Sequence, residues 1–149
     1  MLGYDAAYQK DRSDTELLET AKSGSLILLT SDEELYRTAT FRRIESYLVR
    51  GKTEPERLAE LAERFTLRLK IDPSKSRCPN CGATIKKIEK EGIESLIPAA
   101  TFKVYKTFWV CTNPTCSKIY WQGSHWGKIE QTLQAAKNIL EPKSSSAGR

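Results

Sequence analysis

The chain has 149 residues, of which 39% are hydrophobic and 29% are charged, a composition typical of a soluble globular protein with one ordinary domain or two small ones. No apolar stretch approaches the roughly 20 residues that a membrane-spanning helix needs, and no basic segment followed by an apolar segment marks a secretory signal, so we expect a cytoplasmic protein without a membrane partner. The formal charge is +5, but residues 1–76 carry a net −1 (13 Lys and Arg, 14 Asp and Glu) and residues 77–149 a net +6 (11 against 5), which indicates either a polyanionic partner such as RNA or a solvated basic surface.

The first 24 residues predict a short strand and then a helix. Residues Tyr4–Tyr8 are expected to form the strand. Ser13 and Glu16 fit the capping-box pattern, in which the Ser hydroxyl and the Glu carboxylate each bind a backbone N–H group at the start of a helix. Gly24 is a natural end for that helix.

The stretch LILLTSDEEL predicts a strand that delivers an acid at its end. Leu26–Thr30 is apolar without alternation, which suits a buried central strand. Asp32 has two interpretations. It can cap a short helix over Glu33–Arg37, a role that Ser31 could fill instead. Alternatively it can bind a metal, because ligands of open α/β sheets lie beyond the carboxyl ends of the strands.

A third strand and the clearest helix of this half follow. Glu45–Val49 reads as a strand. Thr53 and Glu56 form a second capping box, and Pro55 is tolerated in the first helical turn. The alternation of strands and helices predicts an α/β fold with a mostly parallel sheet. Only about three strands can be found, whereas a three-layer sheet usually has about five.

Ile71–Ser76 reads as a linker, after which Cys, aromatic residues and Lys become frequent. We therefore predict one domain over residues 1–71, a second over 72–142, and a disordered tail over 143–149. The expected elements of the second domain are two strands, a C-terminal helix and a proline that ends it: Lys103–Val110, Ile119–Trp121, His125–Leu140 and Pro142.

Four cysteines form two closely spaced pairs, Cys78 with Cys81 and Cys111 with Cys116, with 29 residues between the pairs. Structural disulfides are uncommon in the reducing cytoplasm, and two such pairs are typical of a zinc ribbon. Four thiolates would fill the tetrahedral coordination of Zn²⁺, so the metal is expected to be structural. The alternatives are buried free thiols or a redox pair.

Aromatic and basic residues near the second cysteine pair are candidates for RNA contacts. Lys103, Lys106 and Lys118 can meet phosphates. The aromatic candidates for base stacking are Tyr105, Phe108, Trp109, Tyr120 and Trp121, and each can equally belong to the core. His125 is a possible metal ligand, general base or RNA contact, but a capping or packing role beside Trp126 is favoured.

The motifs LGYD, LLTSD, CPNC and YWQGSHW occur in an order that resembles the Mut-seven C-terminal RNase domain family. That family joins a PIN-like nuclease fold to a zinc ribbon, and the resemblance extends from Leu2 to about Leu140. It implies a metal-dependent ribonuclease whose carboxylates hold Mg²⁺ or Mn²⁺. Asp14 and Asp32 match two acidic positions of the family, and Glu16 is a weaker third.

In the family, a strand with the first acid and a helix precede the LGYD segment. This chain begins at LGYD, so the resemblance implies a truncated PIN-like three-layer fold and weak or undetectable activity. A non-catalytic RNA- or ribosome-binding protein is the alternative, and a protein-interaction module is a third hypothesis.

Overall fold

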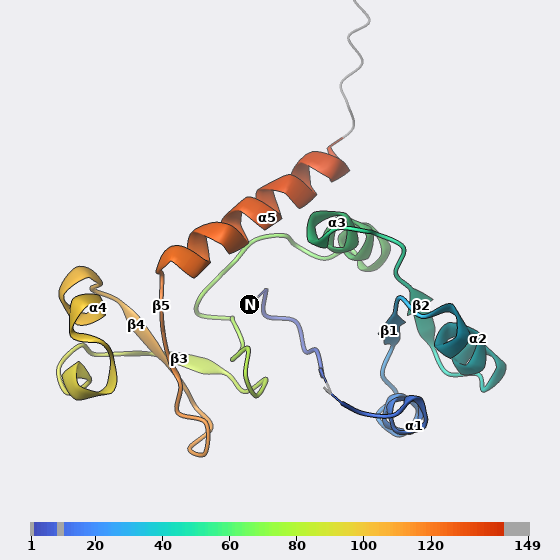
Figure 1. Ribbon diagram of the computed structural model, residues 1–149, viewed down its shortest axis with the longest axis horizontal. Helices are drawn as coiled ribbons and strands as arrows, with labels where there is room; N and C mark the ends of the chain where they lie inside the picture. Colours follow the sequence, from blue (N-terminus) through green and yellow to red (C-terminus); the bar gives the residue numbers. More distant parts are fainter. Residues whose placement is uncertain (1, 9–10, 142–149) are drawn as a thin grey trace, which may run out of the picture. The chain divides into compact units, whose positions relative to one another are not determined.

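The computed structural model describes residues 2–8 and 11–141, which form two compact units (Figure 1). Tyr8–Leu67 make up one unit, and the residues before Tyr8 together with those from Arg68 onward make up the other. The predicted domain limits of 1–71 and 72–142 stay a prediction, because independent folding is measured only by unfolding experiments.

The unit of Tyr8–Leu67 contains three helices and two strands: α1 (Asp14–Ser23), β1 (Leu28–Thr30), α2 (Glu33–Phe41), β2 (Ser46–Leu48) and α3 (Glu54–Phe65). The strands are parallel, with Leu28 opposite Ser46 and Thr30 opposite Leu48. In Figure 1 they lie side by side, next to α2. The core consists of small and branched apolar residues: Leu18, Ala21, Leu35, Ala39 and Ile44.

Side chains of the preceding residues begin all three helices, as predicted. Ser13 and Thr53 each form a complete capping box, with Glu16 and Glu56 respectively. Asp32 caps α2, which extends to Phe41 rather than ending at the predicted Arg37. These bonds satisfy backbone N–H groups that have no partner within the helix.

Two strand predictions in this half of the chain are wrong. Tyr4–Tyr8 forms no strand, and the Tyr4 hydroxyl instead accepts a hydrogen bond from the N–H of Arg68 at 2.6 Å. The run from Leu26 is a strand only from Leu28, and Leu26 and Leu29 are 44% and 46% exposed. Burial on both faces requires a larger covered sheet, and β1 has a single strand neighbour among the described residues.

The mixed α/β class and a parallel strand pair are confirmed. The pair is smaller than the mostly parallel sheet that the alternation predicts. The three-layer PIN-like arrangement remains a prediction.

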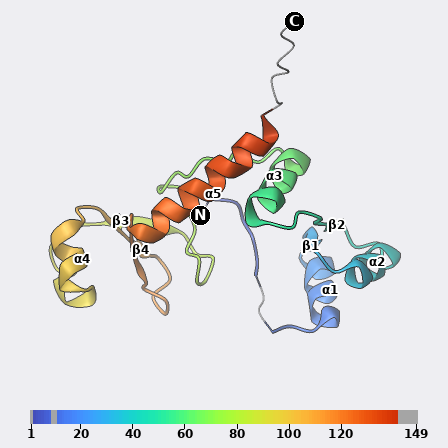
Figure 2. The ribbon, with the colours of Figure 1, turned by 45° about the horizontal axis from the view of Figure 1, so that its top comes forward.

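The second unit contains an antiparallel sheet and helices: β3 (Ile85–Ile88), the 3-10 turn η1 (Glu94–Leu96), α4 (Ala99–Val104), β4 (Phe108–Cys111), β5 (Ile119–Trp121) and α5 (Ser124–Leu140). The strand order is β3-β4-β5. Phe108 is completely buried and packs with Ile93 and Ile97 in the core of this unit. Figure 2 shows α5 as one continuous helix, as its apolar spacing predicts.

The predicted strand over Lys103–Val110 is wrong in its first half. Lys103 and Val104 belong to α4, and the strand begins only at Phe108. Phe102 and Tyr105 are three residues apart and both pack on the core, so helical spacing buries them where an extended chain would place them on opposite faces. β3 was not predicted, because its sequence IKKI does not alternate.

The YWQGSHW segment turns sharply between β5 and α5. A Cβ atom at Gly123 would lie 2.9 Å from the indole nitrogen of Trp121, so a side chain at this position would force a rearrangement. The predicted helix end at Pro142 and the predicted disordered tail lie outside the described residues. No helix in residues 2–8 and 11–141 combines the length and apolar character that crossing a bilayer requires.

Candidate metal centre and acidic residues

Local backbone geometry brings the four cysteines to one end of the antiparallel sheet. The N–H of Gly82 binds the carbonyl of Cys78 at 2.9 Å, and Gly82 has a φ of +75°, a conformation that favours glycine. Cys111 is the last residue of β4. The N–H of Cys116 binds the carbonyl of Asn113 at 3.0 Å, which closes the second turn.

The sulfur atoms of Cys78, Cys81, Cys111 and Cys116 all lie within 4.8 Å of one another. The Sγ atoms of Cys78 and Cys116 are 3.7 Å apart, and those of Cys81 and Cys111 are 3.4 Å apart. Four sulfurs bound at about 2.3 Å to one tetrahedral ion would be separated by about 3.8 Å. The cluster is therefore compatible with one structural metal ion bound by four thiolates.

Neighbouring polar groups surround the sulfurs. The Tyr120 hydroxyl lies 3.0 Å from the Sγ of Cys78. The amide Nδ2 of Asn80 donates to the Sγ of Cys116 at 3.4 Å. The Nζ of Lys118 in turn donates to the Oδ1 of Asn80 at 3.1 Å. Such bonds orient thiolate ligands and distribute their charge.

The thiols differ in acidity. Burial by itself raises the pKa of Cys78, but hydrogen bonds from the Tyr120 hydroxyl and from backbone N–H groups outweigh burial and lower the pKa to about 6. The backbone N–H of Lys118 lowers the pKa of Cys116. Burial, reinforced by the neighbouring thiols, raises the pKa of Cys111 to about 12. The site thus favours some thiolates but opposes four, unless a cation lies among them.

The three candidate acids differ in how many oxygens they leave open. Asp32 accepts the N–H groups of Glu34 and Leu35 with Oδ1 alone, at 2.8 and 3.0 Å. Asp14 is exposed, and its carboxylate makes no hydrogen bond or ion pair within the described residues. Both side chains therefore keep oxygens that could bind a cation.

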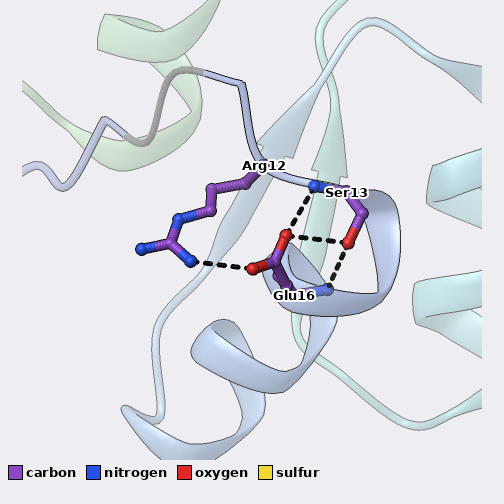
Figure 3. A network of polar contacts seen from close by, with 3 residues as sticks. All are labelled: Arg12, Ser13 and Glu16. Atoms are coloured by element: carbon purple, nitrogen blue, oxygen red, sulfur yellow. Dashed lines mark hydrogen bonds and ion pairs between the residues drawn. The ribbon is translucent and has the colours of Figure 1, made fainter.

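Glu16 is already engaged (Figure 3). Its Oε2 accepts from the N–H and hydroxyl of Ser13, both at 2.9 Å, and its Oε1 accepts from Arg12 at 2.7 Å. These bonds, led by the backbone N–H of Ser13, lower its pKa to about 2. The Glu16 carboxylate thus stabilises the start of α1 through the capping box.

Across the part of the chain that the structure describes, the four cysteines are the one group of three or more ligand-type side chains gathered within 4.8 Å. Asp14, Asp32 and Glu16 do not form such a group there. Their catalytic assignment stays a prediction.

The three candidate RNA-binding lysines are exposed. Lys103 lies in the last turn of α4, Lys106 follows that helix, and Lys118 precedes β5. Their contact with RNA stays a prediction. The prediction that His125 caps a helix is wrong, because α5 begins at Ser124 with Gly123 as its N-cap residue and without a side-chain cap. The alternative, packing beside Trp126, stays a prediction.

Comparison with known families identifies the chain. The family model of the Mut7-C RNAse domain matches residues 1–133 of the 149. The chain belongs to this family. No curated protein and no solved structure matches it. The Mut7-C match confirms the resemblance and assigns a ribonuclease-related function with RNA as the substrate class.

Asn80 and Tyr120 lie beside the sulfurs of the Mut7-C domain, but that they support the metal centre was not predicted from the sequence. Asn80 lies inside the CPNC turn, and Tyr120 is nine residues beyond Cys111 in the sequence. The position of Asn80 between Cys78 and Cys81 could have indicated that its side chain lies near the sulfurs. Tyr120 becomes a neighbour of Cys78 only because β5 pairs with β4, and no local pattern predicts that contact.

Proposed function

We propose that this chain is a PIN-like, metal-dependent endoribonuclease domain of low activity, joined to a zinc ribbon that helps to bind RNA. The family match over residues 1–133 carries this proposal, because it spans both the acidic half and the four cysteines. A three-layer PIN-like fold is part of the proposal and is supported by the parallel pair β1–β2 beside α1 and α2.

The proposed structural ion is Zn²⁺. Four sulfur donors at near-tetrahedral separations suit Zn²⁺ or iron, and Zn²⁺ is the usual ion of two short cysteine turns. Four protein ligands leave no open position for a substrate. The proposed role of zinc is therefore to hold the C-terminal end of β4 and the two cysteine turns together, in a unit with a small core.

The proposed catalytic ligands are Asp14 and Asp32. When bound, Mg²⁺ or Mn²⁺ would neutralise phosphate charge and activate a water molecule. The open Oδ2 of Asp32 and the unengaged carboxylate of Asp14 supply oxygen donors of the kind that these ions prefer. Because Glu16 is engaged and no group of three acids is gathered within the described residues, we expect weak binding of the ion and weak or undetectable cleavage.

Cleavage of single-stranded RNA with added Mn²⁺ tests the catalytic proposal. Asp32→Asn should abolish any activity and Asp14→Asn should reduce it sharply, with folding intact, because Asn still caps a helix but carries no charge. Glu33→Gln is the matched control, since Glu33 is the next residue and, within the described part of the chain, its carboxylate forms a single exposed ion pair, with Arg37. Robust cleavage that is unchanged in Asp32→Asn would contradict the assigned site.

A non-catalytic RNA- or ribosome-binding protein is the second candidate, and the net charge of +6 over residues 77–149 favours it. RNA affinity should then fall steeply as salt rises, and Lys103→Glu, Lys106→Glu or Lys118→Glu should weaken it. Binding that ignores salt would indicate a protein partner instead.

A further inference from the structure

The sheet β3-β4-β5 has two faces, and its register separates them. Ile88, Phe108 and Trp121 form one cross-strand row. Phe108 belongs to the core cluster, and the partly buried Ile88 and Trp121 pack against it. The neighbouring row consists of Lys87, Trp109 and Tyr120. Because successive side chains of a strand point to opposite faces, this second row lies on the face away from the core.

Trp109 is the central residue of the row on the face away from the core. It is half-buried, it is not part of the core cluster, and it makes no ring contact or hydrogen bond within the described residues. By contrast, Phe108 is completely buried and its ring lies 6.5 Å from that of Trp121. Part of the ring surface of Trp109 is therefore accessible, and no hydrogen bond or ring contact within the described residues engages it.

Tyr120 and Lys87, the two cross-strand neighbours of Trp109, differ in how firmly their side chains are held. Tyr120 is held in place by its hydroxyl, which lies 3.0 Å from the Sγ of Cys78. Lys87 is exposed and makes no hydrogen bond or ion pair in the described part of the chain. Residues that are directly opposite in an antiparallel sheet have Cβ atoms about 5 Å apart, so the free ammonium group of Lys87 can reach over the indole.

The charge of the sheet indicates the kind of ligand. Its three strands carry two charged residues and no acid, and of these two Lys87 lies on the same face as Trp109, whereas Lys86 lies on the opposite face. A cationic surface with a partly accessible indole is complementary to a flexible polyanion with exposed aromatic faces. Single-stranded RNA has both properties, whereas a duplex hides the faces of its bases.

We propose that the row Lys87–Trp109–Tyr120 is a binding site for single-stranded RNA, in which an unpaired base stacks on Trp109 and Lys87 contacts a phosphate. This inference rests on the proposed RNA-binding function of the ribbon and assigns a site to it. The fixed ring of Tyr120 borders the site on the side of the cysteines.

The test is binding of a short 2′-O-methyl oligouridine to the full zinc-loaded chain, measured by fluorescence anisotropy. The buffer contains no Mg²⁺ or Mn²⁺, the ions proposed for catalysis, so the result does not depend on the acidic residues. Trp109→Ile keeps a strand-forming apolar residue but removes the ring, and it should weaken binding roughly tenfold. Trp109→Phe keeps a ring and should bind within about threefold of the wild type. A matching RNA duplex should compete poorly.

Lys87 and Lys86 provide a matched pair of variants. They are adjacent, both exposed and identical in charge, but their side chains point to opposite faces of the sheet. Lys87→Ala should weaken binding and reduce the slope of log affinity against log salt by about 0.7, the value for one phosphate contact on a single strand. Lys86→Ala should change that slope less.

Zinc content and circular dichroism establish that each variant is folded. If Trp109→Ile loses zinc, the comparison of Lys87→Ala with Lys86→Ala tests the assigned site instead. Oligouridine binding by the wild type that is unchanged in Trp109→Ile, or equal losses in Lys87→Ala and Lys86→Ala, would overturn the assigned site and leave RNA binding by the ribbon intact. A wild-type protein that binds no RNA even at low salt would overturn the proposed function as well.

Discussion

At the scale of single residues, the acids of the N-terminal half are distinguished by what their oxygens already bind. Glu16 has both oxygens engaged, by Ser13 and Arg12. Asp32 engages one oxygen with the start of α2 and leaves the other open. Capping and metal binding are thus compatible for Asp32, whereas Glu16 would have to leave its capping box to bind a metal.

Glu16 should make stability depend on pH in a predictable direction. The pKa of Glu16 is lowered from 4.5 to about 2 in the folded chain. Its contribution to the free energy of unfolding is therefore complete above about pH 4.5 and is lost as the pH falls toward 2. The difference in stability between the wild type and Glu16→Gln should therefore be present at neutral pH and shrink toward pH 2. Urea unfolding followed by circular dichroism at a series of pH values measures this difference.

Glu19→Gln is the control for this experiment, because Glu19 lies on the same helix and makes no hydrogen bond or ion pair within the described residues. It should change stability little at any pH. A Glu16→Gln difference that stays constant between neutral pH and pH 2 would contradict the role assigned to the capping box.

At the scale of elements, the residue that caps the C-terminal end of α3 has a backbone conformation that it does not favour. Thr66 has φ 54° and ψ 43°, the left-handed region, at the position where many helices have glycine. A β-branched residue is strained there.

Thr66→Gly should raise the free energy of unfolding by about 1 kcal/mol, because glycine adopts this conformation without the steric cost of a Cβ atom. Thr66→Ala keeps the Cβ atom and should gain less. Chemical denaturation of the three proteins gives the comparison. If Thr66→Gly is no more stable than the wild type, the strain at this helix end is absent or is offset elsewhere.

The elements also explain which parts of the fold could be predicted from the sequence. The starts of α1 and α3 depend on residues three positions apart, so Ser13 with Glu16 and Thr53 with Glu56 were sufficient to predict them. Strands depend on partners that are distant in sequence. The burial of Leu26–Thr30 was predicted wrongly because a local apolar run does not reveal how many strands will cover it.

The same distinction applies to the candidate sites. The spacing of the cysteines is local within each pair, and the structure gathers all four sulfurs as predicted. The row Lys87–Trp109–Tyr120 requires the register of three strands, one of which was not predicted. The sequence placed Trp109 among five equivalent aromatic candidates, and only the register separates it from the buried Phe108.

At the scale of the whole molecule, the two units depend on different forces. The unit of Tyr8–Leu67 has an apolar core formed by α1, α2 and neighbouring residues and contains no cysteine. The second unit has a small core and four thiols whose charges oppose one another without a cation. A metal ion should therefore stabilise one unit and leave the other nearly unchanged.

Removal of zinc by a strong chelator should unfold the sheet β3-β4-β5 while α1, α2 and α3 remain protected. Hydrogen exchange resolved by residue measures both units in one sample. Returning one equivalent of Zn²⁺ should restore protection in the sheet. Equal loss of protection in both units, or none in either, would contradict the assigned division of roles.

The claim on which the RNA-binding half of the proposal stands is that Cys78, Cys81, Cys111 and Cys116 together hold one zinc ion. Elemental analysis of protein purified without chelator tests it most directly, with the Cys116→Ser variant measured alongside. We predict one equivalent of zinc per chain and substantially less in the variant. Protein without zinc, or zinc retained in full after Cys116→Ser, would contradict the four-cysteine centre.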